Sequence, residues 1–217
     1  MALFSLLLHP KFQLSHMKAL LLIDVQNDFI LDGALSVMGG ADIIPLLNRL
    51  QPAFDLVVAT QDWHPAGHQS FASQHPGQAA FSQLDLHGLP QTLWPDHCVQ
   101  NTPGAALHPT LDTARVEAIF RKGTDPEIDS YSAFFDNGHR KSTGLADYLR
   151  GRGVRQVYVA GLAADYCVYF SAKDAQAEGF ETFFIEDATR AIDAAGLVVA
   201  KTRLQDLGVR LATSYEI

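Results

Sequence analysis

The feature that most constrains the fold is a series of short apolar runs separated by helix-like segments. Residues 17–25 (MKALLLIDV) form an apolar run with a carboxylate near its end, which is typical of a strand buried on both faces of a parallel sheet. Comparable runs occupy residues 54–60, 117–121, 156–161, 182–186 and 209–213. Helix-like patterns occupy residues 42–50, 143–150, 165–178 and 193–207. This alternation predicts βαβ units, a mostly parallel sheet and right-handed crossovers.

The length and charge of the chain narrow the function classes. With 217 residues, it can form one large domain with a substantial core. The formal net charge of -8, without a Lys/Arg cluster, argues against nucleic-acid and membrane partners, which reward basic surfaces. Two cysteines do not make a disulfide framework, so we expect free thiols in the reducing cytoplasm.

The first sixteen residues differ from the rest of the chain. Residues 4–8 are mostly apolar, but no basic segment precedes them and no small-residue cleavage site follows. They are also too few to span a bilayer. We therefore expect residues 1–16 to be an extension outside a single folded domain at residues 17–217. A signal peptide is the alternative.

One long segment breaks the alternation of strands and helices. Residues 63–109 show no clear period, yet they contain six of the ten prolines, six of the nine histidines and both tryptophans. Loops of this length inside a domain are uncommon and tend to be functional or disordered. The tryptophans favour order, so we expect an ordered functional excursion here, with metal binding at about residues 62–109.

Cys167 is the candidate nucleophile. It follows the fourth predicted strand, and Asp165 is a suitable N-cap, which predicts Cys167 in the first turn of the next helix. The partial positive charge and free N–H groups of a helix N-terminus favour a thiolate and can hold an oxyanion. The alternative is a buried structural cysteine.

Two further polar residues stand at the ends of predicted strands. Asp24 ends the first strand, and Lys122 follows the third. In a doubly wound sheet, a crevice opens where the strand order reverses, here between the first and fourth strands, so Asp24 and Cys167 would face each other. Lys122 would stabilise both anions. Alternatively, Asp24 is a turn residue, a role that Asp28 could equally fill, and Lys122 is a solvated surface charge.

A metal site is predicted directly after the second strand. Asp62 and His64 point to the same side of an extended segment, and His97 follows later in the excursion. One carboxylate and two imidazoles suit Zn best, or Fe or Mn, and leave coordination positions open. His68 is a less favoured fourth ligand. Cys98 is interpreted as structural. The alternative is polar loop residues that bind no metal.

Aromatic residues accompany these groups. Phe29 and Trp94 belong either to the core or to the wall of a pocket for a flat aromatic substrate. Tyr131 and Tyr166 are weaker candidates for the same pocket.

Five motifs, in order, carry a resemblance to a known family. They are ALLLIDVQNDF, QDWHPAGHQSFAS, LPQTLWPDHCVQNTPGA, FRKGTDPEIDSYSAFFDN and GLAADYCV. From Lys18 onward, the chain resembles the nicotinamidase/pyrazinamidase branch of the isochorismatase-like cysteine hydrolases. The resemblance implies an α/β fold, a doubly wound three-layer sandwich with a six-stranded, mostly parallel sheet. A departure is Ala164, where many relatives have Thr, which removes a hydroxyl beside the nucleophile turn.

The resemblance also implies roles for individual residues. The catalytic triad would be Asp24, Lys122 and Cys167, and the metal ligands would be Asp62, His64 and His97. The oxyanion hole would be the N–H groups of Ala163 and Cys167, next to a cis peptide at Leu162–Ala163. Phe29 and Trp94 would clamp the substrate ring, with Tyr131 and Tyr166 nearby.

The implied activity is hydrolysis of nicotinamide to nicotinate and ammonia through a thioester on Cys167, with pyrazinamide as a further substrate and the metal as a template for the pyridine ring. Assembly into a homo-oligomer stays open. A carbamoyl-amide hydrolase or an isochorismatase would share the triad but generally lacks the Asp-x-His pair and the distal His. A nucleotide-binding module would need a glycine-rich phosphate motif after the first strand, which is absent. Metal-hydroxide hydrolysis would leave Cys167 structural.

Overall fold

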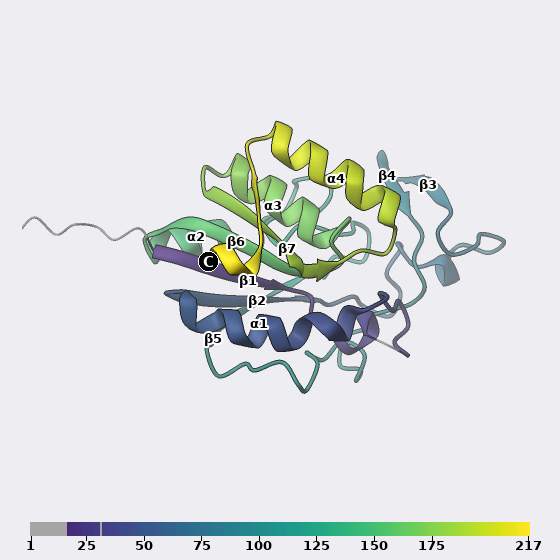
Figure 1. Cartoon of the computed structure of the whole chain (residues 1–217). Coiled ribbons are helices and arrows are strands. Elements are labelled where there is room, and N and C mark those ends of the chain that lie inside the picture. Colours follow the sequence, from purple (N-terminus) through teal and green to yellow (C-terminus); the bar gives the residue numbers. More distant parts are fainter. Residues whose placement is uncertain (1–16, 31) are drawn as a thin grey trace, which may run out of the picture.

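The computed structural model of the protein describes residues 17–30 and 32–217. The described residues form a six-stranded sheet with the order β5-β2-β1-β6-β7-β8, in which all neighbours are parallel (Figure 1). Its strands are β1 (Met17–Ile23), β2 (Leu56–Asp62), β5 (Val116–Lys122), β6 (Val154–Leu162), β7 (Glu181–Arg190) and β8 (Arg210–Ala212). The helices are α1 (Ile44–Leu50), α2 (Leu145–Gly151), α3 (Cys167–Ala177) and α4 (Ala194–Asp206).

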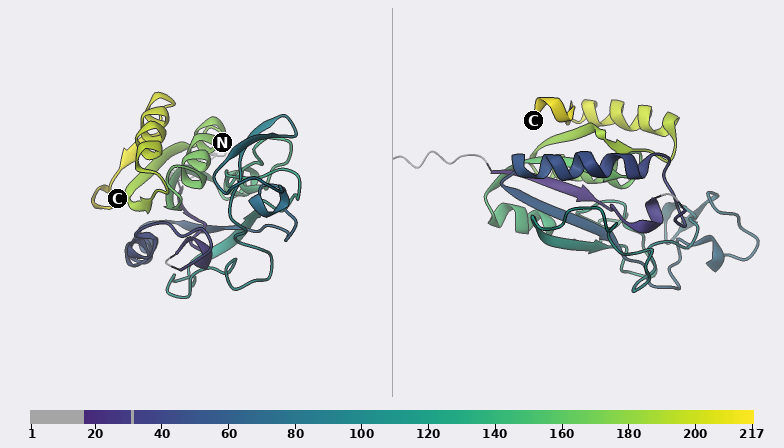
Figure 2. Two further views of the ribbon diagram at one scale, coloured as in Figure 1. Left: turned by 90° about the vertical axis from the view of Figure 1, so that its right-hand side faces the viewer. Right: turned by 60° about the horizontal axis from the view of Figure 1, so that its bottom comes forward.

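The central strand β1 explains why helices cover both faces of the sheet. Successive side chains of a strand point to opposite faces. Leu20 and Leu22 pack in the core on the α1 side, whereas Ala19, Leu21 and Ile23 pack in the core formed with α2, α3 and α4. Figures 1 and 2 show α1 on one side of the sheet and α3 and α4 on the other. The predicted doubly wound three-layer α/β fold is therefore confirmed.

The strand order reverses between β1 and β6, as the sequence predicted. Leu21 pairs with Val58 of β2 on one side and with Val159 of β6 on the other. The chain builds the sheet outward from β1 in one direction and then, from β6 onward, in the other. Such a reversal opens a crevice at the carboxyl ends of the two central strands.

The observed element bounds differ from the predicted ones where the backbone turns. β1 ends at Ile23, not at residue 25, because Asp24 adopts a left-handed conformation with φ 47° that a strand cannot continue through. The predicted helix 42–50 begins as a 3₁₀ turn at Gly40–Ile43 and becomes α1 at Ile44. The predicted helix 165–178 starts at Cys167.

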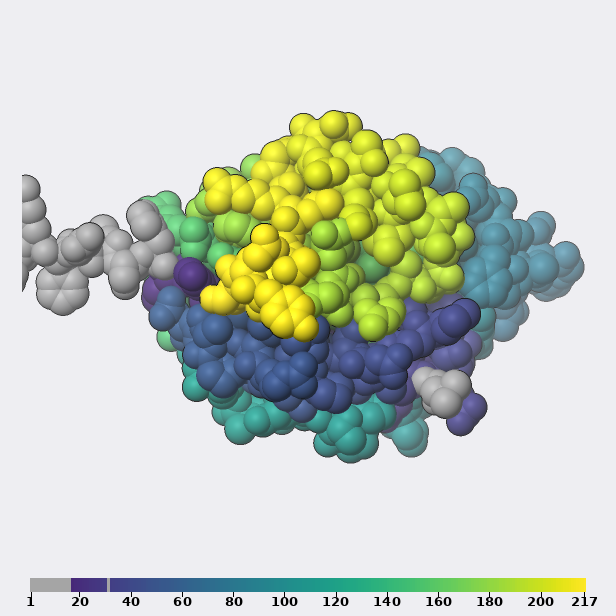
Figure 3. Space-filling view, viewed as in Figure 1, coloured from purple at the N-terminus to yellow at the C-terminus, as the bar shows by residue number. Residues whose placement is uncertain are grey.

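The aperiodic segment 63–109 contains a hairpin that the sequence analysis missed. β3 (Gln83–Leu86) and β4 (Leu89–Thr92) pair antiparallel through His87 and Gly88. Both turn residues have positive φ, 55° and 83°, as a two-residue hairpin of type I′ requires. The His-Gly pair between the short segments QLDL and LPQT was the available signal. In the space-filling view, part of the segment forms the right-hand end of the molecule (Figure 3).

The predicted N-terminal extension, residues 1–16, lies outside the described residues. Among residues 17–30 and 32–217, none of the helices has the length and apolar character needed to cross a membrane.

Candidate active site

Four polar side chains meet at the carboxyl edge of the sheet, around the switch point between β1 and β6. Asp24 follows β1, Asp62 ends β2 and Lys122 ends β5, while Cys167 begins α3 after β6. The structure brings Asp24 and Cys167 together, as predicted, with Cys167 Sγ and a carboxylate oxygen of Asp24 within 4.8 Å. All four side chains are nearly or fully buried, so their mutual interactions are only weakly screened by solvent.

Lys122 is the centre of this group. Its Nζ lies 2.9 Å from Asp24 Oδ2 and 2.9 Å from Asp62 Oδ1, and it donates to Cys167 Sγ at 3.4 Å. The same ammonium donates to the backbone oxygen of Ser130 at 3.0 Å. The side chain of Lys122 has no solvent exposure, which rules out the alternative of a solvated surface charge.

The other carboxylate oxygen of Asp24 is held by a residue that the sequence analysis did not identify. The Thr60 hydroxyl donates to Asp24 Oδ1 at 2.6 Å and accepts from the Asp24 N–H at 3.1 Å. Asp24 is therefore fixed by a cation on one oxygen and by a hydroxyl on the other.

Burial and neighbouring charges together shift the pKa values of these side chains. Burial raises the pKa of Asp24 above its ordinary value of 3.8, against the lowering effect of Lys122. Burial also raises the pKa of Cys167 well above its ordinary value. For Lys122, burial lowers the pKa, but Asp24 and Asp62 outweigh it and hold that pKa well above its usual range. The helix position of Cys167 predicted a favoured thiolate, but burial instead favours a thiol that needs a base.

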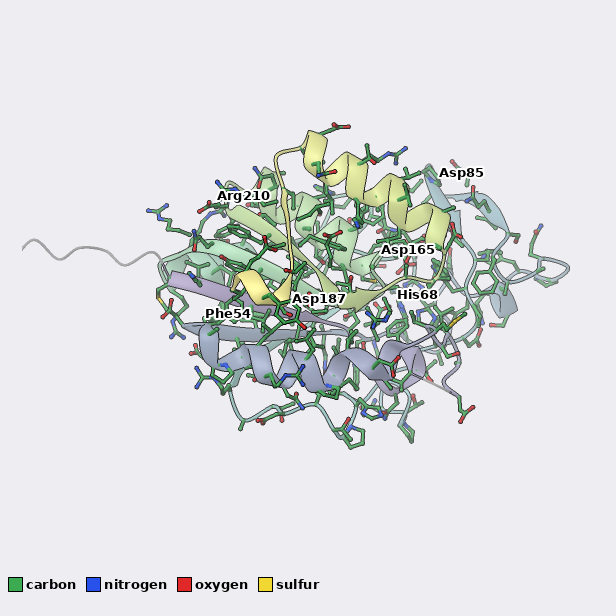
Figure 4. The ribbon with its side chains drawn as sticks, in the orientation of Figure 1. Phe54, His68, Asp85, Asp165, Asp187 and Arg210 are labelled. Atoms are coloured by element: carbon green, nitrogen blue, oxygen red, sulfur yellow. The ribbon has the colours of Figure 1, made fainter. Side chains whose placement is uncertain are left out.

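The predicted N-cap role of Asp165 is wrong. The first helical residue of α3 is Cys167, as expected, but its N-cap is Tyr166 and no side chain caps it. The Asp165 carboxylate instead accepts from the N–H groups of Ile192 (3.0 Å) and Asp193 (2.8 Å), which follow β7. Asp165 therefore ties the nucleophile turn to the segment before α4 (Figure 4).

The turn before Cys167 presents the two predicted oxyanion donors. The peptide bond between Leu162 and Ala163 is cis, as predicted. Within residues 17–30 and 32–217, the N–H groups of Ala163 and Cys167 have no hydrogen-bond acceptor, whereas their neighbour Ala164 donates to the oxygen of Arg190. Because these two N–H groups beside the nucleophile donate to no described protein atom, they are free to donate to an oxyanion.

Asp62, His64 and His97 form one compact donor set. His64 Nε2 and His97 Nε2 lie 3.1 Å and 3.4 Å from Asp62 Oδ2. Burial raises the pKa of Asp62, but His64 and Lys122 outweigh it, so the pKa of this carboxyl stays well below its usual range. Asp62 thus offers a carboxylate whose two oxygens face Lys122 and the imidazoles.

The arrangement around these donors fits a divalent metal ion. His64 Nδ1 lies 3.0 Å from the Gly123 oxygen and His97 Nδ1 lies 2.8 Å from the Pro95 oxygen. Backbone oxygens at Nδ1 fix the tautomer in which Nε2 carries the lone pair, as in known metal sites. His64 Nε2 is buried without a hydrogen-bond partner among the described residues. The geometry and burial of the three donors therefore fit a divalent metal.

His68 and Cys98 lie beside this donor set but outside it. His68 shares a second cluster with His64 and Asp129, and its Nδ1 contacts the Ser70 hydroxyl at 2.7 Å. Burial lowers the pKa of His68 to about 4. Cys98 is fully buried, and its N–H donates to Asp28 Oδ2 at 2.7 Å. Asp28 therefore has a structural role, which differs from the position of Asp24 beside Cys167.

A small cavity borders both the nucleophile group and the metal donors. All four predicted aromatic residues border it, and so do the nucleophile, one oxyanion residue and two metal donors: Phe29, Trp94, Tyr131, Tyr166, Cys167, Ala163, Asp62 and His97. Three further lining residues were missed by the sequence analysis: Leu35, Asp129 and Ile192. They come from loops, where apolar periodicity gives no signal.

The aromatic walls support one another. Trp94 packs edge-on against Tyr166 at 4.8 Å between ring centroids, and its Nε1 donates to the Tyr131 hydroxyl at 3.3 Å. Phe29 packs edge-on against His97, with 5.5 Å between ring centroids. The cavity wall beside the metal donors is therefore largely aromatic.

Known proteins share this arrangement of sequence and fold. The family model described as the isochorismatase domain matches residues 18–216. The chain belongs to this isochorismatase family. A nicotinamidase of Escherichia coli (strain K12) is 50% identical over 180 residues, which cover 81% of this chain and 84% of the relative. The predicted resemblance to the nicotinamidase/pyrazinamidase branch is thereby confirmed.

Solved structures of the family agree with the fold. The nicotinamidase pyrazinamidase of Acinetobacter baumanii has a TM-score of 0.91 and 44% identity, covering 93% of this chain and 98% of that one. The pyrazinamidase of Pyrococcus horikoshii, solved in complex with zinc, has a TM-score of 0.75 and 36% identity. Its match covers 91% of this chain and 99% of the other.

Proposed function

We propose that the protein is an amidohydrolase that converts nicotinamide to nicotinate and ammonia, with Cys167 as nucleophile. The observation that carries the proposal is the single cavity bordered both by Cys167 and by the metal donors Asp62 and His97. A pyridine carboxamide has two recognition points, the ring nitrogen and the amide, which such a cavity can address together. The nicotinamidases among its relatives support this substrate.

The cavity walls would orient the ring. Phe29 and Trp94 offer aromatic surfaces for a flat heterocycle, and Tyr131 and Tyr166 complete the wall near Cys167. When bound, the metal ion supplies a Lewis-acid contact for the ring nitrogen, directly or through water. Asp62, His64 and His97 would hold it, and zinc is our choice because of this donor set and the zinc-bound relative, with iron and manganese as alternatives.

The first chemical step is attack on the amide carbon. Asp24, whose raised pKa makes it a better base than an ordinary carboxylate, removes the proton of the Cys167 thiol. The resulting thiolate forms a bond to the amide carbon, and the N–H groups of Ala163 and Cys167 donate to the oxyanion. Lys122 stabilises the thiolate through its contact with Sγ.

The intermediate then loses ammonia. Asp24 returns its proton to the leaving nitrogen as the carbon–nitrogen bond breaks, which leaves a thioester on Cys167. Water attacks the thioester carbon while Asp24 takes one of its protons. The carbon–sulfur bond breaks, the thiol regains its proton, and nicotinate leaves. The net reaction consumes one water and releases one ammonia for each amide.

The same groups suggest further properties. Pyrazinamide carries the same carboxamide with a ring nitrogen in the same meta position, so it should be a second substrate. The reaction needs a free Cys167 thiol, and both cysteines are free, which suits the cytoplasm. The family match supports one hydrolase domain at residues 17–217.

Ammonia release from a panel of amides tests the proposal. The panel contains nicotinamide, pyrazinamide, benzamide and an aliphatic carbamoyl compound, each with and without a chelator. We expect release from the first two amides, with a raised KM after chelation. Benzamide lacks the ring nitrogen and should be a poor substrate in both conditions. Release confined to the aliphatic compound would overturn the pyridine assignment, and normal turnover by fully metal-free protein would overturn the metal role.

A further inference from the structure

The side chain of Gln26 holds the main chain of Asp62. Gln26 follows β1 and is fully buried. Its Oε1 accepts from the N–H of Asp62 at 2.8 Å, and its Nε2 donates to the carbonyl oxygen of the same residue at 2.8 Å. One primary amide therefore satisfies both backbone polar groups of Asp62. A second hydrogen bond from Nε2 reaches the oxygen of Ala105, also at 2.8 Å.

Gln26 can bind the Asp62 main chain because β1 ends before β2 does at the carboxyl edge of the sheet. The last registered pair between the two strands is Leu22 with Ala59, after which β1 turns away at Asp24. β2 continues to Asp62, which pairs with Lys122 of β5 on its other side. A strand end without a neighbour exposes unpaired N–H and C=O groups that are costly to bury. The Gln26 amide takes the place of the missing β1 residues.

The hydrogen bonds from Gln26 affect the site because Asp62 takes part both in the group around Lys122 and in the metal donor set. Its Oδ1 contacts Lys122, and its Oδ2 faces the two imidazoles of the metal donor set. A shift or rotation of the Asp62 backbone would move both oxygens together. Gln26 is also tied to the general base, since its N–H donates to the carbonyl oxygen of Asp24 at 2.8 Å.

We infer that Gln26 is a positioning residue that fixes the Asp62 carboxylate for metal binding. The inference rests on the proposed function, because it takes the metal site as given. It goes beyond that function in assigning metal retention to a residue that touches neither the donor atoms nor the cavity. Partners that orient ligands in this way typically change metal affinity by about 10–100-fold when they are removed.

Gln61, which directly precedes Asp62, provides a matched control. Gln61 is buried and donates through Nε2 to the same oxygen of Ala105, at 3.0 Å, but among the described residues its side chain has no hydrogen bond to the Asp62 backbone. Gln26→Leu removes the Ala105 contact together with the Asp62 clamp, whereas Gln61→Leu removes only an Ala105 contact. The difference between the two variants isolates the clamp on Asp62.

The test follows zinc loss from the zinc-loaded full-length protein to an excess of a colorimetric chelator. We expect Gln26→Leu to lose zinc about 10-fold faster than the wild type or more, and Gln61→Leu to stay within about twofold. Excess zinc should restore much of the kcat/KM of Gln26→Leu, which a general loss of structure would not allow. Gln26→Glu, which keeps an acceptor for the Asp62 N–H but loses the donor, should also release zinc faster and serves if Gln26→Leu does not fold.

The possible outcomes distinguish a failure of the Gln26 role from a failure of the proposed function. If the wild type retains zinc and the folded Gln26 variants retain it equally well, the inference is overturned and the proposed function stands. The inference is also overturned if Gln61→Leu loses zinc as fast as Gln26→Leu, because the Ala105 contact would then explain the effect. If the wild type itself binds no zinc, and His97→Ala changes nothing, both proposals fall.

Discussion

Replacement of Lys122 by methionine tests the charge balance of the site most sharply. The substitution keeps a long apolar stem but removes an ammonium that lies 2.9 Å from each of two buried carboxylates. At that distance and an effective dielectric constant of about 20, each attraction is worth about 6 kcal/mol before desolvation is counted. Removal of one partner from a buried ion pair typically costs about 3–5 kcal/mol of folding free energy. That is a large part of the stability of an ordinary domain.

The loss should depend on pH in a defined direction. Without Lys122, burial and the neighbouring carboxylate both raise the pKa of Asp24 further above 3.8, the value that applies to the unfolded chain. The folded state then binds this proton more tightly than the unfolded state, so stability falls as pH rises from about 3.8 through the folded-state pKa. Lys122→Met should therefore lose more stability relative to the wild type at pH 8 than at pH 5.5.

Urea unfolding of the metal-free proteins at these two pH values measures the effect, and ammonia release measures its consequence. We expect kcat/KM to fall by about 100-fold or more, because a protonated Asp24 cannot act as base. Arg121→Met is the control, since Arg121 is exposed and stacks on Trp63 at 3.8 Å, a contact worth about 1 kcal/mol. Wild-type stability at pH 8, or a loss equal to that of the control, would refute the reasoning.

Two further predictions concern the base and the metal site. The raised pKa of Asp24 places the acidic limb of the kcat/KM profile above pH 3.8, and a flat profile down to that pH would argue against Asp24 as the base. Gly123→Ala should weaken zinc binding, measured by competition with a chelator, because a Cβ there would overlap His64, 2.7 Å from its Nδ1. Gly179→Ala introduces similar backbone strain at positive φ, but its added Cβ would have no atom within 4 Å. This variant should therefore bind zinc normally.

The sequence was sufficient to predict groups that stand at strand ends. Asp24, Asp62 and Lys122 each stand at the carboxyl end of a strand, and parallel strands bring these ends to one edge. Local position and topology together therefore predicted that Asp24 and Lys122 meet Cys167, whereas the ion pair between Lys122 and Asp62 was not predicted. The ligand pair of Asp62 and His64 was predictable for a similar reason, because alternate residues of an extended segment point the same way.

Features that depend on distant partners could not be predicted in this way. Asp165 looked like a helix cap, but its carboxylate bonds to Ile192 and Asp193, which lie far along the chain. The thiolate expected at Cys167 followed from its helix position alone, whereas the raised pKa follows from burial. Gln26 gave no signal at all, since its role depends on where β1 turns away from β2.

The most direct test of the central claim is the mass of the protein during turnover. Wild-type enzyme is mixed with nicotinamide, quenched in acid within one turnover, and digested for peptide mass analysis. We expect a nicotinoyl group on the peptide that contains Cys167, none on the peptide that contains Cys98, and no ammonia release from Cys167→Ala. Robust ammonia release from folded Cys167→Ala would contradict the account and leave metal-hydroxide hydrolysis as the explanation.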